Sequence, residues 1–377
     1  MEQKVCSRCV MDTTVSDIWF AEDGECKYCK IHDEMERRHP LNEGEAKLKS
    51  IIEAIKRSGK GKKYDCVCGL SGGRDSSYTL LKAVEFGLRP LVVSIDNGWG
   101  TAIAEENIEN ACRILNLEVI WVKFDWEEYK DLQRSFFFAS VPDVDSPSDF
   151  AIYAQLSKTA KEHGIKYILN GHSFRTEGSS PISWSYFDPV YIKDVQRRFG
   201  KIKYDNIRTI ARMTPWDLVK RTFIHRIKEI RILEYMDYRK PEVDKILKEK
   251  LGWKDYGGHH HENKFTHFVQ SYYLPLKFNI DKRKTELSAQ IRSGHISKKE
   301  AEAVLSRPYS YDSAIVDEVI ARLGFTIAEF EAIMQAPNKS YKDYKTLQPV
   351  YKLLRFPINV ATHLGFLPRI LYLKYCK

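Results

Sequence analysis

A serine- and glycine-rich segment offers the clearest chemistry in this sequence. Its members are Ser71, Gly72, Gly73, Arg74, Asp75, Ser76 and Ser77. Two glycines let a backbone approach an anion without a Cβ in the way, and hydroxyl groups add hydrogen-bond donors. The carboxylate of Asp75 would repel a phosphate unless Mg²⁺ lay between them. The segment therefore predicts a loop that binds the phosphates of a metal-bound nucleotide.

A second group of reactive side chains lies near the N-terminus. Two Cys-x₂-Cys pairs stand sixteen residues apart, and they comprise Cys6, Cys9, Cys26 and Cys29. Each pair can direct two thiolates at one ion, and this spacing is typical of a closed, tetrahedral Zn²⁺ site. An iron–sulfur cluster and a redox pair are the alternatives. We expect a structural zinc ion, because a module this small lacks a hydrophobic core and metal binding can take its place.

A third group is the histidine-rich segment 256–268. His260, His261 and Glu262 could transfer protons, for which imidazole is suited near neutral pH. They could also bind a metal, although a second metal site would need more widely spaced ligands. A surface turn in which these side chains pair and cap is the third interpretation, and composition alone slightly favours it.

Alternating strands and helices are expected to position the phosphate-binding loop. Strands are predicted at 64–70, 90–96, 118–124 and 166–170, and helices at 76–86, 102–115 and 148–163. Such alternation predicts βαβ units, a parallel sheet and ligands beyond the carboxyl ends of the strands. The loops 70–77, 96–101 and 170–178 are therefore the informative ones, and Leu70, Asp96, Asn170 and Gly171 stand at strand ends.

Three parts are expected along the chain. A zinc-knuckle module (1–45) precedes a Rossmann-like α/β domain (46–235), and a helical region (236–377) for substrate or partner follows. Strand signals fade beyond about Pro215. The basic and apolar stretch 351–377 is expected to pack as a terminal helix, with docking to a membrane surface or a partner as the alternative.

Composition is that of a folded, water-soluble protein. The 377 residues are 43% hydrophobic and 29% charged, and no apolar run reaches the length of a signal peptide or membrane span. We therefore expect a cytoplasmic protein. The net charge of +9 suits ATP, nucleotide sugars or RNA as ligands, although solvated lysines explain it equally well.

The phosphate-binding loop resembles that of a known superfamily. No Walker loop and no three-glycine dinucleotide fingerprint occurs in the sequence. Residues 69–76, Gly-Leu-Ser-Gly-Gly-Arg-Asp-Ser, instead resemble the pyrophosphatase loop of the N-type ATP pyrophosphatases. The resemblance implies that the loop holds the β,γ-pyrophosphate of ATP while AMP passes to a substrate oxygen. It also implies adenosine contacts at Asp96 and a comparable glycine-containing turn at Asn170 and Gly171.

A narrower resemblance spans about residues 3–310. The opening Cys-Ser-Arg-Cys-Val-Met-Asp-Thr-Thr, the loop, the histidine-rich segment and residues 268–284 together resemble the N-acetyl sugar amidotransferases of surface-polysaccharide biosynthesis. That family converts the acetamido group of an activated sugar into an acetamidino group. The sequence departs from it at Arg74, where relatives often have Lys, and at His172, where they have Glu, which leaves the role of the second loop uncertain.

The resemblance implies a mechanism and assigns roles to residues. The acetamido oxygen would attack the α-phosphorus of ATP, and ammonia would then displace AMP from the adenylated intermediate. Charge at the α-phosphate would be neutralised by Lys277, Lys282 or Arg283. Protons from the attacking ammonium would be accepted by His260, His261 or Glu262.

The resemblance also implies partners. A nucleotide-linked N-acetyl sugar would be the acceptor, and ammonia would come from a separate glutaminase subunit like those of histidine biosynthesis, alone or with its cyclase-like companion. Residue 2 is Glu rather than the cysteine that an N-terminal glutaminase needs.

Two other functions remain open at this point. A tRNA-modifying enzyme that adenylates a base before sulfur transfer would share the loop, but we expect no nucleic-acid partner because no RNA-binding domain is recognisable. Cys66 and Cys68 also fall inside a predicted strand rather than in a loop. A non-enzymatic scaffold with a vestigial nucleotide fold is the third possibility, and the intact loop argues against it.

Overall fold

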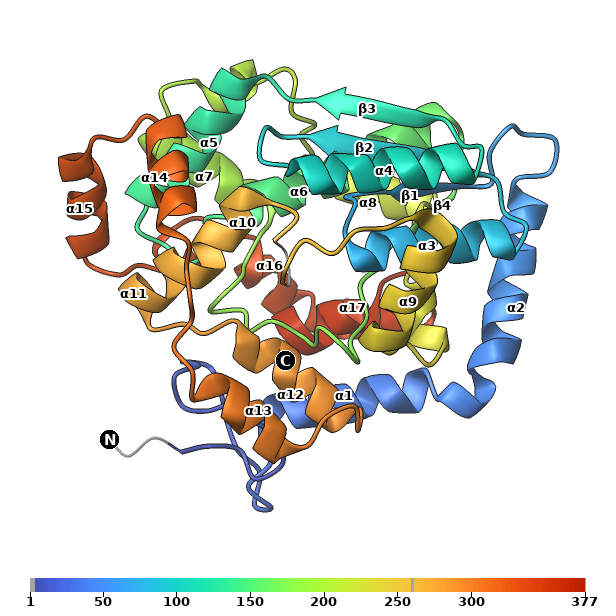
Figure 1. Ribbon diagram of the computed structural model, residues 1–377, viewed down its shortest axis with the longest axis horizontal. Helices are drawn as coiled ribbons and strands as arrows, with labels where there is room; N and C mark the ends of the chain where they lie inside the picture. The colour runs from blue at the N-terminus through green and yellow to red at the C-terminus, as the bar shows by residue number, and fades with distance from the viewer. Residues whose placement is uncertain (1–3, 259–260, 377) are drawn as a thin grey trace.

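The computed structural model describes residues 4–258 and 261–376 and has an α/β core (Figure 1). Its strands are β1 (Cys66–Gly69), β2 (Pro90–Asp96), β3 (Val119–Lys123), β4 (Tyr167–Leu169) and β5 (Lys228–Ile230). They form one parallel sheet in the order β3-β2-β1-β4-β5. The order reverses at β1, which is the topological switch point where ligands bind in Rossmann-like folds.

Helices cover both faces of the sheet and, with the loops that join them, form most of the remaining chain. They are α1 (Lys27–Arg38), α2 (Leu41–Ser58), α3 (Arg74–Glu85), α4 (Ala102–Ile114), α5 (Trp126–Phe138), α6 (Ser146–Glu162), α7 (Pro189–Phe199), α8 (Pro215–Val219), α9 (Lys240–Leu251), α10 (Lys264–Phe268), α11 (Leu274–Phe278), α12 (Arg283–Arg292), α13 (Lys298–Leu305), α14 (Ser313–Arg322), α15 (Ile327–Gln335), α16 (Gln348–Leu353), α17 (Arg355–His363) and α18 (Arg369–Leu371). Short 3₁₀ or π segments used below are η2 (Lys220–Ile224), η3 (Ile232–Tyr235), η4 (Val269–Tyr273) and η6 (Tyr372–Cys376).

The side chains of β1 point alternately to the two faces of the sheet, and each face is covered by a layer of helices. Cys66 and Cys68 pack with the side chains of α3 and α4, whereas Val67 packs with Ala160 of α6. Successive side chains of a strand point to opposite faces, so a strand that is apolar throughout is buried on both sides. The parallel α/β core expected from the sequence is confirmed.

The edge strand β5 was not expected. It consists of Lys228, Glu229 and Ile230, and it pairs in parallel with β4. This strand lies beyond about Pro215, where strand signals fade in the sequence. Three residues with two charged side chains carry no apolar alternation, so only pairing with β4 defines this strand.

The N-terminal segment packs on the helical C-terminal region. At the bottom of Figure 1, α1 lies beside α12, which in turn packs on α13. Lys284 of α12 forms an ion pair with Asp12, and Lys298 of α13 donates to the carbonyl oxygen of Cys6. No helix in the described residues is long and apolar enough to cross a membrane.

Candidate active site

The Ser71–Ser77 loop lies at the switch point, between β1 and the N-terminus of α3. Gly73 is the N-cap of α3 and has extended backbone angles. Gly72 has a φ of +75°, and a Cβ there would lie 2.1 Å from the carbonyl oxygen of Ala104. Only glycine fits that position. Helix N-termini bind anions, so the loop has the geometry of a phosphate site.

The hydroxyl groups of the loop are not equivalent. The Oγ atoms of Ser71 and Ser76 are 3.1 Å apart, and the Ser71 amide donates to Ser76 Oγ. The side chain of Ser77 is fully buried, and its hydroxyl has no hydrogen-bond partner among the described residues. Ser71 is exposed at the loop surface, Ser76 Oγ also donates to the carbonyl oxygen of Gly73 at 3.1 Å, and Ser77 faces the protein interior.

Arg74 is held by α9 and not by the loop. Its guanidinium makes two hydrogen bonds to Asp244 and lies 5.8 Å over the ring of Trp253. Its backbone amide donates to the hydroxyl of Tyr256 at 3.1 Å. The Arg74 side chain, which was expected to face phosphate, is thus engaged in packing. Arg in place of the Lys that relatives often have suits the bidentate pair with Asp244.

Asp75 meets a second carboxyl group, that of Glu177. The two are hydrogen-bonded to each other, and Tyr238 donates its hydroxyl to Asp75. Burial raises the pKa of Asp75 well above its ordinary value, and the charge of Glu177 adds to this effect. Two adjacent carboxylates repel each other, so a hard dication with oxygen ligands such as Mg²⁺ fits the pair.

The segment that follows β4 brings Glu177 to the loop. A Cβ on Gly171 would lie 2.7 Å from the backbone carbonyl of Asp75, so the two loops touch at a glycine. The side chain of Asn170 accepts from the amide of His172 at 2.7 Å. His172 in turn lies with Nδ1 2.7 Å from Glu177 Oε2. The predicted second loop thus adjoins the first, and the sequence analysis missed Glu177, its one carboxylate, six residues beyond Gly171.

A polar cavity of about 240 Å³ opens beside Glu177. It is lined by the N-terminus of α6, the segment 172–185, η4 and α12. Two of its lining side chains, Ser146 and Thr285, are at least nine-tenths buried, and their hydroxyl oxygens have no hydrogen-bond partner among the described residues. Buried polar groups are normally satisfied, so these hydroxyls point to a polar ligand.

Lys282 is the one Lys or Arg among the described residues that line this cavity. Its ammonium donates to Ser180 Oγ at 2.8 Å. Burial lowers the pKa of Lys282, and the nearby carboxylates of Asp149 and Asp145 oppose that effect. This placement suits the predicted role of a cation at the reacting centre.

The other two predicted cations are engaged elsewhere. Lys277 donates to the backbone carbonyl oxygens of residues 333, 334 and 336 at 2.7, 3.2 and 2.7 Å. An ammonium group has three donors, and all three are used at the end of α15. Arg283 forms a bidentate pair with Asp281, three hydrogen bonds in all. Neither side chain lines the cavity, and both are paired with other groups, so the structure lends their predicted role at phosphate no support.

The histidine-rich segment reaches the loop. A Cβ on Gly73 would lie 3.0 Å from Glu262 Oε1, and the amide of Thr101 donates to the carbonyl oxygen of Glu262. The ring of His261 stacks on that of His267 at 3.6 Å. His260 lies outside the described residues. Glu262 therefore lies beside the Ser71–Ser77 loop.

Asp96 ends β2 on the same edge of the sheet. Its Oδ1 accepts from the amide of Gly98 at 2.9 Å, and Lys123 lies 3.8 Å from its other oxygen. The carboxylate thus shapes its own turn, which leaves the predicted adenosine contact an expectation.

Lys240, which the sequence analysis did not single out, forms an ion pair with Glu286 of the cavity wall and acts electrostatically on Asp75.

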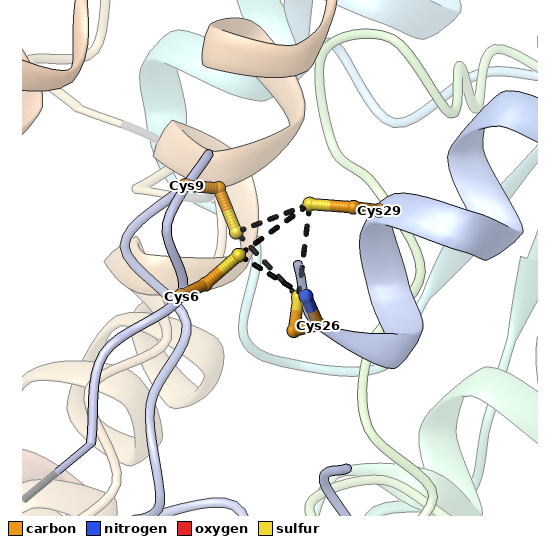
Figure 2. A group of neighbouring side chains, drawn as sticks. All are labelled: Cys6, Cys9, Cys26 and Cys29. Carbon is orange, nitrogen blue, oxygen red and sulfur yellow. Dashed lines mark hydrogen bonds between the residues drawn. The ribbon is translucent and has the colours of Figure 1, made fainter. Parts of the chain in front are cut away.

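The four N-terminal cysteines converge on one point (Figure 2). All are fully buried, and four of their sulfur pairs lie 3.7 to 3.8 Å apart. Zn–S bonds of about 2.3 Å at tetrahedral angles give that same separation, so the sulfurs fit a zinc ion. The guanidinium of Arg292 lies 3.6 Å from Cys9 Sγ and offsets thiolate charge.

Comparisons with known proteins cover parts of the chain. Residues 262–356 match the family described as the C-terminal domain of WbpG-like LPS biosynthesis proteins. This stretch supplies Lys282 and Thr285 to the cavity. An uncharacterized protein of Methanocaldococcus jannaschii is 33% identical over 132 residues, or 33% of this chain and 45% of that protein. The chain thus spans less than half the length of this relative.

Two solved structures are similar at low identity. An NH3-dependent NAD synthetase from Campylobacter jejuni is 14% identical with a TM-score of 0.28, over 55% of this chain and 93% of that one. An NMN synthetase from Francisella tularensis is 12% identical with a TM-score of 0.28, over 61% and 94%. Values this low carry no information about the reaction.

Proposed function

We propose that the protein is an ATP-dependent amidotransferase that converts the acetamido group of a nucleotide-linked N-acetyl sugar into an acetamidino group, for a surface glycan such as lipopolysaccharide. One observation carries the proposal. The phosphate-binding loop, the carboxyl pair of Asp75 and Glu177, and a polar cavity with unsatisfied hydroxyls adjoin one another at the switch point. The match of residues 262–356 to an LPS biosynthesis family supports the substrate class.

The loop and the carboxyl pair would handle ATP. Backbone amides at the start of α3, with the hydroxyls of Ser71 and Ser76, hold the leaving pyrophosphate. Asp75 and Glu177 would hold Mg²⁺, which neutralises charge on the phosphate oxygens during transfer. His172, 2.7 Å from Glu177, fixes the orientation of that carboxylate.

The cavity would hold the acceptor sugar. Its volume of about 240 Å³ is below the roughly 300–1,000 Å³ of pockets for drug-sized ligands, so it suits one sugar ring and not a whole nucleotide sugar. Ser146 and Thr285 would hydrogen-bond to sugar hydroxyls. Lys282 would contact the acetamido oxygen as it gains the adenylyl group.

The second step is displacement by ammonia. The amide oxygen, once adenylated, leaves as AMP, and nitrogen takes its place on the same carbon. Glu262, beside Gly73, is the best-placed of the predicted proton acceptors among the described residues. We propose that ammonia comes from a separate glutaminase subunit, so ammonium salts support turnover by the pure chain and glutamine does not.

A sulfur-transferring tRNA enzyme is less well supported. Cys66 and Cys68 are fully buried in β1, and Cys112 is buried in α4. Among the described residues, Cys376 is the one cysteine with appreciable exposure, and it lies in the tail. No thiol therefore stands at the site to carry sulfur.

The test is AMP formation from ATP, ammonium and a panel of nucleotide-linked N-acetyl sugars. Asp75→Asn and Glu177→Gln should each lower the rate at least roughly 100-fold, because each removes charge that stabilises the transferring phosphoryl group. Mass spectrometry should identify a product in which NH replaces oxygen. Wild-type turnover in either variant, with unchanged circular dichroism, would rule out the assignment.

A further inference from the structure

Two helical segments far apart in the sequence meet in an exposed apolar surface. Residues 216–224, in α8 and η2, expose Trp216 and Ile224 by 60% and 64%. Residues 350–366, in α16, α17 and the turn after them, expose Leu353 and Phe356 by 81% and 74%. The rings of Phe223 and Phe366 lie 6.2 Å apart and join the two. We call residues 216–224 and 350–366 the apolar face.

The helix α17, drawn in red in Figure 1, turns apolar side chains toward solvent, unlike an ordinary surface helix. Phe356, Val360 and Leu364 follow one another at helical spacing and are all exposed, whereas Ile358 and Thr362 are buried. Helices of soluble proteins normally turn such a stripe toward the core. A large contiguous apolar patch at the surface marks a site of interaction with a protein or a membrane.

The charges around the apolar face are mostly positive, and its one acidic residue, Asp217, caps the start of α8 through Thr214. No Asp or Glu occurs in residues 218–228 or 344–377. Arg226, Lys228, Lys352 and Arg355 are exposed, and none of them forms an ion pair within the described part of the chain. Apolar side chains rimmed by unpaired cations complement a surface with anionic groups above an apolar interior, which is the character of an anionic lipid bilayer.

The apolar face lies where contact with a partner leaves the candidate active site accessible. Phe223 and Ile224 precede β5, at its N-terminal end, whereas the loop 71–77 and Glu177 follow the C-terminal ends of β1 and β4. All strands are parallel, so this part of the apolar face lies at the opposite edge of the sheet. A subunit that delivers ammonia has to open toward the site, so this edge favours a membrane over such a subunit.

We infer that the apolar face docks the protein peripherally on anionic lipid, with Phe356 and Leu364 entering the interface and Lys352 and Arg355 contacting headgroups. The protein would work at a membrane surface without spanning it. The choice of a membrane over an ammonia-delivering subunit rests on the proposed function, whereas the exposed apolar side chains and unpaired cations, and the vesicle test, do not.

Vesicle flotation tests it with the full chain. Wild-type protein should float with vesicles of phosphatidylcholine containing phosphatidylglycerol, should float poorly with pure phosphatidylcholine, and should be released by salt. Lys352→Gln/Arg355→Gln should weaken binding about 25-fold, from about fivefold for each cation near the surface. Leu353→Ser/Phe356→Ser/Leu364→Ser should abolish flotation without unfolding, because these side chains are already exposed.

Matched controls lie elsewhere on the surface. Ile327→Ser removes an apolar side chain that is 77% exposed, and Lys299→Gln removes an exposed cation, so both should float like wild type. Absence of wild-type flotation, or equal losses in the controls, would overturn the inference. If the triple variant instead loses a stoichiometric complex with a glutaminase subunit while wild type ignores vesicles, the face is a protein interface.

Discussion

Two lysines five residues apart illustrate how position decides the role of a side chain. Lys277 donates to three backbone carbonyls near the end of α15, and Lys282 lines the cavity. Both belong to a basic stretch in the sequence, yet the turn at Asn279, with a φ of +54°, separates α11 from α12 and directs the two side chains to different places.

Substitution should separate these roles. Lys277→Met should lower the free energy of unfolding by about 2–4 kcal/mol, since three carbonyls lose a charged donor, with AMP formation by the folded protein unchanged. Lys282→Met should abolish most AMP formation and leave stability equal or higher, since burial disfavours that charge. Urea unfolding and the AMP assay measure the two effects. A Lys277 variant that folds normally but is inactive would contradict this division.

At the scale of elements, the four-cysteine cluster holds the N-terminal segment against α12. Val10 donates its amide to Ser288 Oγ at 3.3 Å, and Arg292 of the same helix contacts Cys9. Short loops without a large core depend on the metal for their fold. The four-cysteine cluster therefore supports the helix that presents Lys282 and Thr285 nearby.

Loss of the metal should consequently destabilise the protein. Cys26→Ser should lower zinc content from one equivalent and reduce stability by several kcal/mol, because structural zinc contributes its binding energy to folding. Elemental analysis and thermal melting report both changes. Cys376→Ser, in the tail, is the matched control and should keep its zinc. Bound iron in the wild type would show that the cluster has a different role.

At the scale of the whole molecule, α1 and its C-cap are joined to the site segment and to η3 by the buried His32 and the partly buried His39. The ring of His32 lies 5.2 Å from that of Phe174, and the ring of His39 lies 5.1 Å from that of Tyr235 in η3. Arg175 ties the same parts together through Glu36 and the carbonyl oxygen of residue 234. Three regions distant in sequence thus meet behind the segment that carries Glu177.

This junction predicts sensitivity to acid. Burial lowers the pKa of His32 to about 3 and of His39 to about 4, from an ordinary value of 6.5, with nearby arginines adding to the effect. The unfolded chain therefore binds more protons, so stability is complete above pH 6.5 and falls as the pH drops toward 4 and 3. Lowering the pH from 7 to 5 should reduce the free energy of unfolding by about 2 kcal/mol for each histidine.

Urea unfolding at pH 7 and pH 5, with zinc present, measures the slope of the free energy of unfolding against pH. His39→Gln should remove about half of it, whereas His163→Gln, at a site outside the junction, should leave it unchanged. An equal slope in the His39 variant would exclude the junction as its source.

The sequence by itself determined the parts whose chemistry is local. Spacing identified the cysteine cluster, glycines and a strand–helix boundary identified the phosphate-binding loop, and apolar runs identified β1 to β4. These patterns suffice because neighbouring residues create the required geometry. Tertiary structure alone decided that Glu177 meets Asp75, that Lys282 faces the cavity while Lys277 and Arg283 do not, and that β5 exists. Those outcomes depend on contacts between residues distant in the chain, whose side-chain directions follow from packing and leave no periodic signal in the sequence.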